Sequence, residues 1–305
     1  HTPTRRQRQM CIRDRRYNST VKANNYSTVS FLSDYGNKDE FVGVVKSVIH
    51  SIANEVSIID ITHGIKPHDI RAGSLALARA SQYLLPGIVL AVVDPGVGGD
   101  RRAVAIEINN GEYVFVGPDN GLLALAIAML GEVTVAIELD NPDFHIPTYS
   151  STFDGRDIFA PVSAHLCAGV PIIELGTSIP ELSLQPGLMP VSSMEGNFLV
   201  AEVLWQDHFG NLQLNISQED IEGFNDNLVI HIGDKVRTVR KVNAFNQIQE
   251  SEIGIISDSS GLLSLCAFGR SAAEEIRVSE GQQIKIENGS PLQETPTMIT
   301  IKEKP

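Results

Sequence analysis

Residues 92–102 combine a carboxylate, a rigid turn and two arginines in a way that can hold a small molecule. An apolar run over residues 88–93 leads into Asp94 and a proline, and three glycines within four residues precede Arg101 and Arg102. Glycines let a backbone approach a ligand closely, and ligands of α/β sheets bind at the carboxyl ends of strands. The alternative is a plain β-turn with a solvated ion pair, and this segment alone leaves both open.

Four further segments are richer in polar residues and glycine than their apolar surroundings require. They are residues 33–36, 60–64 and 117–121, which end expected strands or follow them, and residues 151–157, which precede an expected helix. Each alone is compatible with a turn or a helix N-cap, for which Asp119 and Asp157 are suited. Because several of them fall at carboxyl ends of strands, we expect the five segments to form one site.

Well-known catalytic signatures do not match these segments. The sequence has no Walker lysine motif, no GxGxxG opening a helix after the first strand, no GxSxG and no HExxH. His63 and His68 are five residues apart without a third ligand nearby, so we expect a structural or ligand-stacking role and no metal. Phosphate transfer and metal-dependent hydrolysis are therefore disfavoured.

The elements that must position these segments alternate over the first two-thirds of the chain. Strands are expected at 28–33, 56–61, 88–93, 103–108, 113–116 and 133–139, and helices at 39–53, 69–84, 121–130 and 157–168. After a linker rich in proline and serine, strands and turns follow at 198–205, 212–216, 228–232, 235–242, 253–256, 262–267 and 283–286. The pattern predicts an α/β fold: an N-terminal layered α/β domain (27–182), a linker (183–196) and a smaller C-terminal β-barrel or sandwich domain (197–305).

Composition narrows the class of protein. The 305 residues are 42% hydrophobic and 20% charged, as in ordinary globular proteins, without an apolar run long enough to span a bilayer. Three scattered cysteines argue against a disulfide framework or a cysteine zinc site and favour a reducing cytoplasm.

Charge is unevenly distributed. Residues 1–16 carry six arginines and one aspartate, a net charge of +5, and the whole chain carries −13, so the remainder carries −18. We expect residues 1–26 to be a disordered, extraneous leader. The acidic body argues against nucleic acid and suits a cationic small ligand, and we expect no membrane partner.

Five ordered motifs, FLSDYG, DITHGI, VVDPGVGGDRR, GPDNG and TFDGRDIFAP, resemble the S-adenosyl-L-methionine (SAM) hydroxide adenosyltransferases, relatives of the fluorinating and chlorinating enzymes. The resemblance extends from about residue 29 to 278, and the second domain contributes DHFGN at 207–211 and SSG at 259–261. It implies hydrolysis of SAM to adenosine and L-methionine without a cofactor. It also implies a homotrimer with the ligand at the subunit interface, between the α/β domain of one subunit and the β domain of its neighbour.

The resemblance assigns substrate-binding roles to six residues: Asp34, Asp39, His68, Asp207, Asn211 and Ser259. Asp34 matches the carboxylate that grips the ribose 2′- and 3′-hydroxyls, and Asp39 lies in the same loop. His68 falls where a ring packs against the nucleoside. Asp207 and Asn211 match groups that hold the methionine amine, and Ser259 a residue at the carboxylate and adenine end. Ser260 replaces an arginine of the halogenating relatives.

Asp94, Arg101 and Asp154 are the expected catalytic residues. Attack at C5′ displaces a neutral thioether, so the reaction needs an aligned water and a proton acceptor but no acid for the leaving group. In the family an aspartate, an arginine and a histidine handle the water, and Asp94 and Arg101 match the first two. The histidine belongs to the family's motif TFHGRDIF, and Asp154 stands at its position in this sequence. Because Asp154 could act as a base or pair with Arg101 or Arg156, we expect altered but retained hydrolysis.

Other functions stay open. One is a non-catalytic SAM-binding protein with its cluster disabled at Asp154, and another is a generic nucleoside-binding α/β protein. A halide-using adenosyl transferase is the minor alternative, because only residues 109–112 join two strands where fluorinating relatives carry a long insertion, and a carboxylate repels a halide.

Overall fold

The computed structural model describes residues 26–289, so the basic segment at 1–16 and Cys11 lie outside the described residues. The chain divides into two compact units. The first comprises the chain up to His63 with Leu84–Asp119 and Gly131–Leu184, and the second comprises Gly64–Tyr83, Asn120–Leu130 and the chain from Gln185 onward. Over the described residues, every helix is too short or too polar to cross a membrane.

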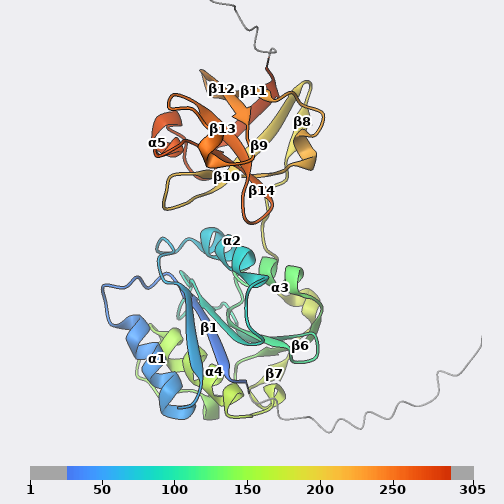
Figure 1. Ribbon diagram of the computed structural model, residues 1–305. Coiled ribbons are helices and arrows are strands. Elements are labelled where there is room, and N and C mark those ends of the chain that lie inside the picture. Colours follow the sequence, from blue (N-terminus) through green and yellow to red (C-terminus); the bar gives the residue numbers. More distant parts are fainter. Residues whose placement is uncertain (1–25, 290–305) are drawn as a thin grey trace, which may run out of the picture. The chain divides into compact units, whose positions relative to one another are not determined.

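A seven-stranded sheet in the order β2-β1-β3-β5-β4-β6-β7 forms the centre of the first unit (Figure 1). Its strands are β1 (Thr28–Ser33), β2 (Ser57–Thr62), β3 (Gly87–Val92), β4 (Ala103–Ile108), β5 (Tyr113–Pro118), β6 (Val133–Glu138) and β7 (Thr177–Ser178). The pairs β2–β1, β1–β3 and β3–β5 are parallel, whereas β4 runs antiparallel to β5 and β6. The carboxyl ends of β1, β2, β3 and β5 therefore meet at one edge, where β4 begins.

The first unit also contains α-helices, a π-helix and 3₁₀ helices. They are α1 (Phe41–Ile52), the π-helix η2 (Gly155–Phe159), α4 (Ala160–Cys167) and the short 3₁₀ helices η1 (Pro142–Phe144), η3 (Ile172–Glu174) and η4 (Glu181–Ser183). In α1, Val45 and Ile49 are buried one turn apart, and α1 packs against α4, which contacts β3. The helix expected at 157–168 thus begins earlier, as a π-helix from Gly155. Isolated π-helical turns are frequent at functional sites.

The second unit contains a closed β-barrel. Its elements are α2 (Ile70–Ser81), α3 (Ala124–Leu130), β8 (Ser193–Glu195), β9 (Phe198–Gln206), β10 (Leu212–Ser217), η5 (Glu219–Ile221), β11 (Asn227–Ile232), β12 (Lys235–Lys241), η6 (Phe245–Gln247), β13 (Ile253–Ser257), β14 (Leu262–Cys266), α5 (Ala272–Ile276) and β15 (Gln283–Asn288). The sheet order is β10-β14-β13-β12-β11-β15-β9-β8, and pairing of β10 with β9 closes seven of these strands. The fold class is confirmed, with a barrel in place of the sandwich alternative.

Two features depart from the sequence pattern. Strand β8 lies inside the expected linker, and its three side chains are exposed, so no alternation of apolar residues marks it. The second unit also includes residues 64–83 and 120–130, which the expected limits of 27–182 place in the first domain. Those domain limits stay a prediction.

The cysteines within the described residues, Cys167 and Cys266, are free and buried.

Candidate active site

A bidentate ion pair joins the two ends of the glycine-rich turn between β3 and β4. Asp94 lies two residues beyond β3, and Arg101 two residues before β4. Nε of Arg101 lies 3.0 Å from Oδ1 and 2.9 Å from Oδ2 of Asp94, and both side chains are largely buried. A bidentate guanidinium–carboxylate pair fixes the orientation of the carboxylate.

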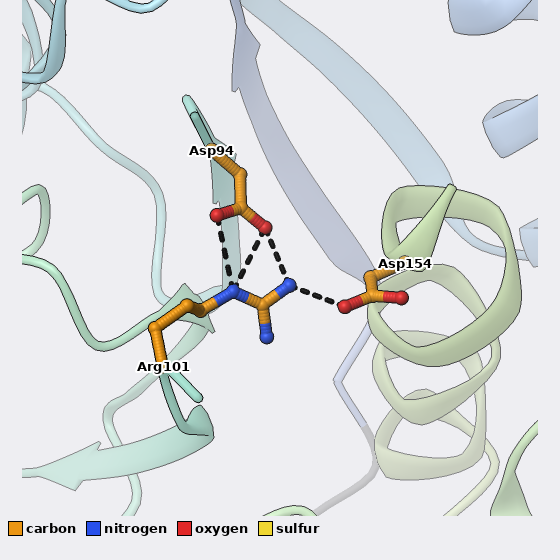
Figure 2. A network of polar contacts seen from close by, with 3 residues as sticks. All are labelled: Asp94, Arg101 and Asp154. Atoms are coloured by element: carbon orange, nitrogen blue, oxygen red, sulfur yellow. Dashed lines mark hydrogen bonds and ion pairs between the residues drawn. The ribbon is translucent and has the colours of Figure 1, made fainter. Parts of the chain in front are cut away.

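The same guanidinium also reaches Asp154, at the N-terminus of η2 (Figure 2). Nη2 of Arg101 donates to both Asp94 and Asp154, and the Asp154 side chain is 9% exposed. Burial alone would lower the pKa of Arg101, but hydrogen bonds and charge from Asp94 and then Asp154 raise it above its usual value. One permanent cation therefore bridges two buried carboxylates, and the cluster carries a net negative charge.

The other arginines near these motifs have separate partners. Arg156 pairs with Asp157 at 2.6 Å, leaving Arg101 as the guanidinium bound to Asp154. Asp119 accepts a hydrogen bond from Nε of Arg102 at 3.0 Å. The carboxylates of Asp119 and Asp157 therefore accept bonds from arginine, and the N-cap interpretation is wrong for Asp157, which lies inside η2.

Asp34 directly follows β1, and its backbone N–H donates to the Val92 carbonyl at 3.3 Å, which ties the end of β1 to the end of β3. Asp39 lies exposed in the loop that leads into α1. Nearby, His63 is buried with Nδ1 2.8 Å from Oγ of Ser33. The end of β1 therefore shares its sheet edge with Asp94, and Asp39 lies beyond it in the exposed loop.

His63 also stabilises the charge of a neighbouring carboxylate. Its Nε2 lies 3.1 Å from Oδ1 of Asp60, whose other oxygen accepts a bond from Lys46. Burial raises the pKa of Asp60, but the bond from Lys46 and then the nearby His63 outweigh it and lower that pKa. These contacts give His63 a structural role at the end of β2.

In the second unit, Asp207, Asn211 and Ser259 line one pocket of about 300 Å³. Oδ1 of Asp207 accepts from the Asn211 backbone N–H at 2.8 Å, and Oδ2 accepts from Nδ2 of Asn211 at 2.7 Å. The carboxylate is thereby held in one orientation at the wall of the pocket. This arrangement is suited to an ammonium group.

Asp258, which the sequence reasoning missed, fixes the loop that carries Ser259. Its Oδ1 accepts from the Ser260 N–H at 2.8 Å, and its Oδ2 from Nε2 of Gln213 at 2.6 Å and Oγ of Ser264 at 3.0 Å. The signal was present as an Asp-Ser-Ser-Gly turn, in which aspartate bonds the backbone two residues on.

A neighbouring pocket of about 560 Å³ is lined by exposed phenyl rings that the sequence reasoning also missed. Phe209, Phe245 and Phe268 are 75%, 48% and 52% exposed, and Asn211 lines both pockets. Exposed aromatic rings around a hollow indicate a site for a flat, apolar ligand group.

His68, also in the second unit, has a left-handed backbone with a φ of 69°. This conformation is uncommon outside functional turns and strained loops.

Comparisons with known proteins identify the family. The model of the SAM hydroxide adenosyltransferase N-terminal domain matches residues 29–176, and that of the C-terminal domain matches residues 201–285. The chain belongs to the SAM hydroxide adenosyltransferase family. The (R)-S-adenosyl-L-methionine hydrolase of Salinispora tropica is 39% identical to this chain, and the match covers 86% of this chain and 98% of the hydrolase. A fluorinase of Actinoplanes sp. is 30% identical, and that match covers 66% of this chain and 76% of the fluorinase. The crystal structure of an uncharacterized conserved protein from Thermotoga maritima matches with a TM-score of 0.78 and 34% identity, covering 85% of this chain and all of that one.

In this SAM hydroxide adenosyltransferase, the structure brings Asp94, Arg101 and Asp154 into one cluster and Asp207, Asn211 and Ser259 into one pocket. Their roles stay predictions. Among residues 26–289, no three His, Cys, Asp or Glu side chains are grouped as metal ligands would be. The cluster can accept protons through its two carboxylates and can hold their positions through Arg101.

Gly98 couples the turn after Asp94 to the segment that carries Asp154. Its φ is +74°, and a Cβ there would lie 2.6 Å from the Ser151 carbonyl oxygen. We expect Gly98→Ala to lower the free energy of unfolding by about 1–3 kcal/mol, because strain and a backbone clash add. Urea unfolding measures this loss of stability.

Gly43→Ala on the exposed face of α1, where a Cβ meets nothing within 4 Å, is the control. We expect it to stabilise the protein by about 0.5–1 kcal/mol. Equal effects at both sites would contradict the coupling.

Proposed function

We propose that this protein hydrolyses SAM to adenosine and L-methionine by attack of water on C5′. The observation that carries the proposal is the Arg101-bridged pair of carboxylates at the carboxyl end of β3. Family membership supports it, because relatives 39% and 36% identical to this chain are named (R)-S-adenosyl-L-methionine hydrolases.

The cluster suits the reaction because the leaving group needs no acid. The water oxygen bonds to C5′ while the C5′–S bond breaks, and its electron pair passes to sulfur, which becomes the neutral thioether of methionine. The proton released by the water passes to Asp94 or Asp154 and then to solvent. Arg101 holds both carboxylates in place and offsets one of their two charges, so the acceptors are positioned before the substrate binds.

Binding roles are proposed for the remaining residues. Asp34 holds the ribose hydroxyls with support from Asp39, and His68 packs against the nucleoside. Asp207 and Asn211 hold the amine, and Ser259 the carboxylate end. The phenyl-lined pocket takes the adenine, since aromatic rings stack on a nucleobase.

The proposal also covers assembly and location. We expect a homotrimer with the substrate bound at the subunit interface, no cofactor, no nucleic-acid or membrane partner, and a cytoplasmic protein. The free cysteines Cys167 and Cys266 fit a reducing compartment. Light scattering after size exclusion tests the assembly.

Two alternatives have specific observations in their favour. At the histidine position, Asp154 accepts a hydrogen bond from Arg101 and offers no imidazole to hold a water, which favours a non-catalytic SAM-binding protein. Similarity to a fluorinase keeps a halide-using transferase as the minor alternative. Two buried carboxylates around one arginine repel a halide, which disfavours it.

One assay decides among the three functions. Purified protein is incubated with SAM, with and without chloride, and the products are separated by chromatography. Equal amounts of adenosine and methionine, unchanged by chloride, are expected. Tight binding of SAM without adenosine above the buffer blank would overturn the hydrolase and leave a binding protein; Asp154→His would then show whether the aspartate disables the cluster. A chlorinated nucleoside would establish the halide reaction.

A further inference from the structure

Tyr35 extends from the end of β1 into an aromatic cluster beside the two carboxylates. Its ring centroid lies 6.4 Å from that of Phe31, 5.9 Å from Phe41 and 5.6 Å from Phe153, with edge-on or tilted contacts. Its backbone N–H donates to Oγ of Ser33 at 3.3 Å. Because the ring is held from several sides, the direction of its hydroxyl is set by the fold.

The hydroxyl points at the first turn of η2, directly beside Asp154. A Cβ built at Gly155 would lie only 2.0 Å from the hydroxyl oxygen, so glycine is needed there to admit the phenol. Burial, and then the negative charges of Asp34, Asp94 and Asp154, raise the pKa of Tyr35 far above its usual value. The phenol therefore stays protonated at every physiological pH and remains a hydrogen-bond donor.

The Tyr35 phenol adds an uncharged donor to a cluster whose two carboxylates are acceptors and whose guanidinium is charged. A water aligned for attack directs one lone pair at C5′ and its two hydrogens at acceptors, and its second lone pair needs a donor. Asp94 and Asp154 are acceptors, and Nε and Nη2 of Arg101 already donate to them.

We propose that the hydroxyl of Tyr35 donates a hydrogen bond to the attacking water and so orients its lone pair towards C5′. The inference rests on the proposed hydrolysis and deepens it. Tyr35 neither gains nor loses a proton in the step: the oxygen–carbon bond forms, the carbon–sulfur bond breaks, and the proton of the water goes to a carboxylate.

Tyr35→Phe removes only the hydroxyl and leaves the ring contacts. We expect kcat for adenosine formation to fall about tenfold, because one hydrogen bond to the reacting water is lost, with KM within about twofold of the wild type. Tyr113→Phe is the matched control: it removes another phenol of the first unit, 3.5 Å from the Leu84 carbonyl, and is expected to leave kcat and KM unchanged.

Gly155→Ala provides a second, independent measurement. Its methyl group should displace the hydroxyl and lower kcat about as much as Tyr35→Phe does, and the double variant should be no slower than Tyr35→Phe alone, because both act through one group. Fully multiplicative losses would contradict this.

The outcomes separate the two proposals. A wild type that makes no adenosine overturns the hydrolase and this inference with it. If the wild type is active and Tyr35→Phe has an unchanged kcat, whether or not its KM is raised, the role of Tyr35 alone is overturned. A thermal unfolding midpoint for each variant shows that the fold is retained.

Discussion

Asp94→Asn is expected to lower kcat by about 10²–10⁴-fold with little change in SAM binding, because the amide keeps the shape of the side chain but cannot accept the proton. Asp94 is the better placed of the two carboxylates, since both of its oxygens are fixed by Arg101. The initial rate of adenosine formation measures kcat, and calorimetry with SAM on the slow variant measures affinity.

Asp157→Asn is the matched control for this substitution. Asp157 is also a buried carboxylate paired with an arginine, Arg156, and it belongs to the same unit. We expect it to lower stability while kcat stays within a few-fold of the wild type. If both variants lose activity equally, the loss reports damage to the fold, and Asp94 is not the proton acceptor.

Arg101→Gln is expected to have the largest effect on stability. It leaves Asp94 and Asp154 buried, 6% and 9% exposed, without the cation that joins them. Breaking a buried ion pair from one side typically costs about 3–5 kcal/mol. We also expect kcat to fall by at least about 100-fold, because both proton acceptors lose their fixed positions. Urea unfolding and the adenosine assay measure the two effects.

A second substitution separates the two effects of Arg101. In Arg101→Gln/Asp154→Asn the mutual repulsion is relieved, so stability should recover in part while activity stays low. Lys46→Gln is the control, since the Lys46–Asp60 pair is 30% and 43% exposed and an exposed pair contributes only about 0–1 kcal/mol. A loss in Arg101→Gln no greater than in Lys46→Gln would contradict the bridging role.

Much of the local structure could be predicted from the order of residues. Strands β1 and β4 match the expected limits to the residue, because each is a short segment rich in buried apolar residues. The sequence pattern does not predict the π-helical turn after Asp154, because π-helical hydrogen bonding depends on how the segment packs on its neighbours. The sequence pattern also does not distinguish a barrel from a sandwich, because the pairing of β10 with β9 is made by backbone atoms, which carry no side-chain signal.

The candidate site divides in the same way. Motif order alone determined the family and the choice of Asp94 and Arg101, because a carboxylate after a strand and an arginine across a short glycine turn are close in the chain and meet by local geometry. That Asp154 binds Arg101 is visible only in the folded protein, since these two residues are 53 apart in the chain. The tertiary structure alone placed the Tyr35 hydroxyl against Gly155. Contacts between distant segments depend on how sheet and helices pack, and no short window of sequence contains that information.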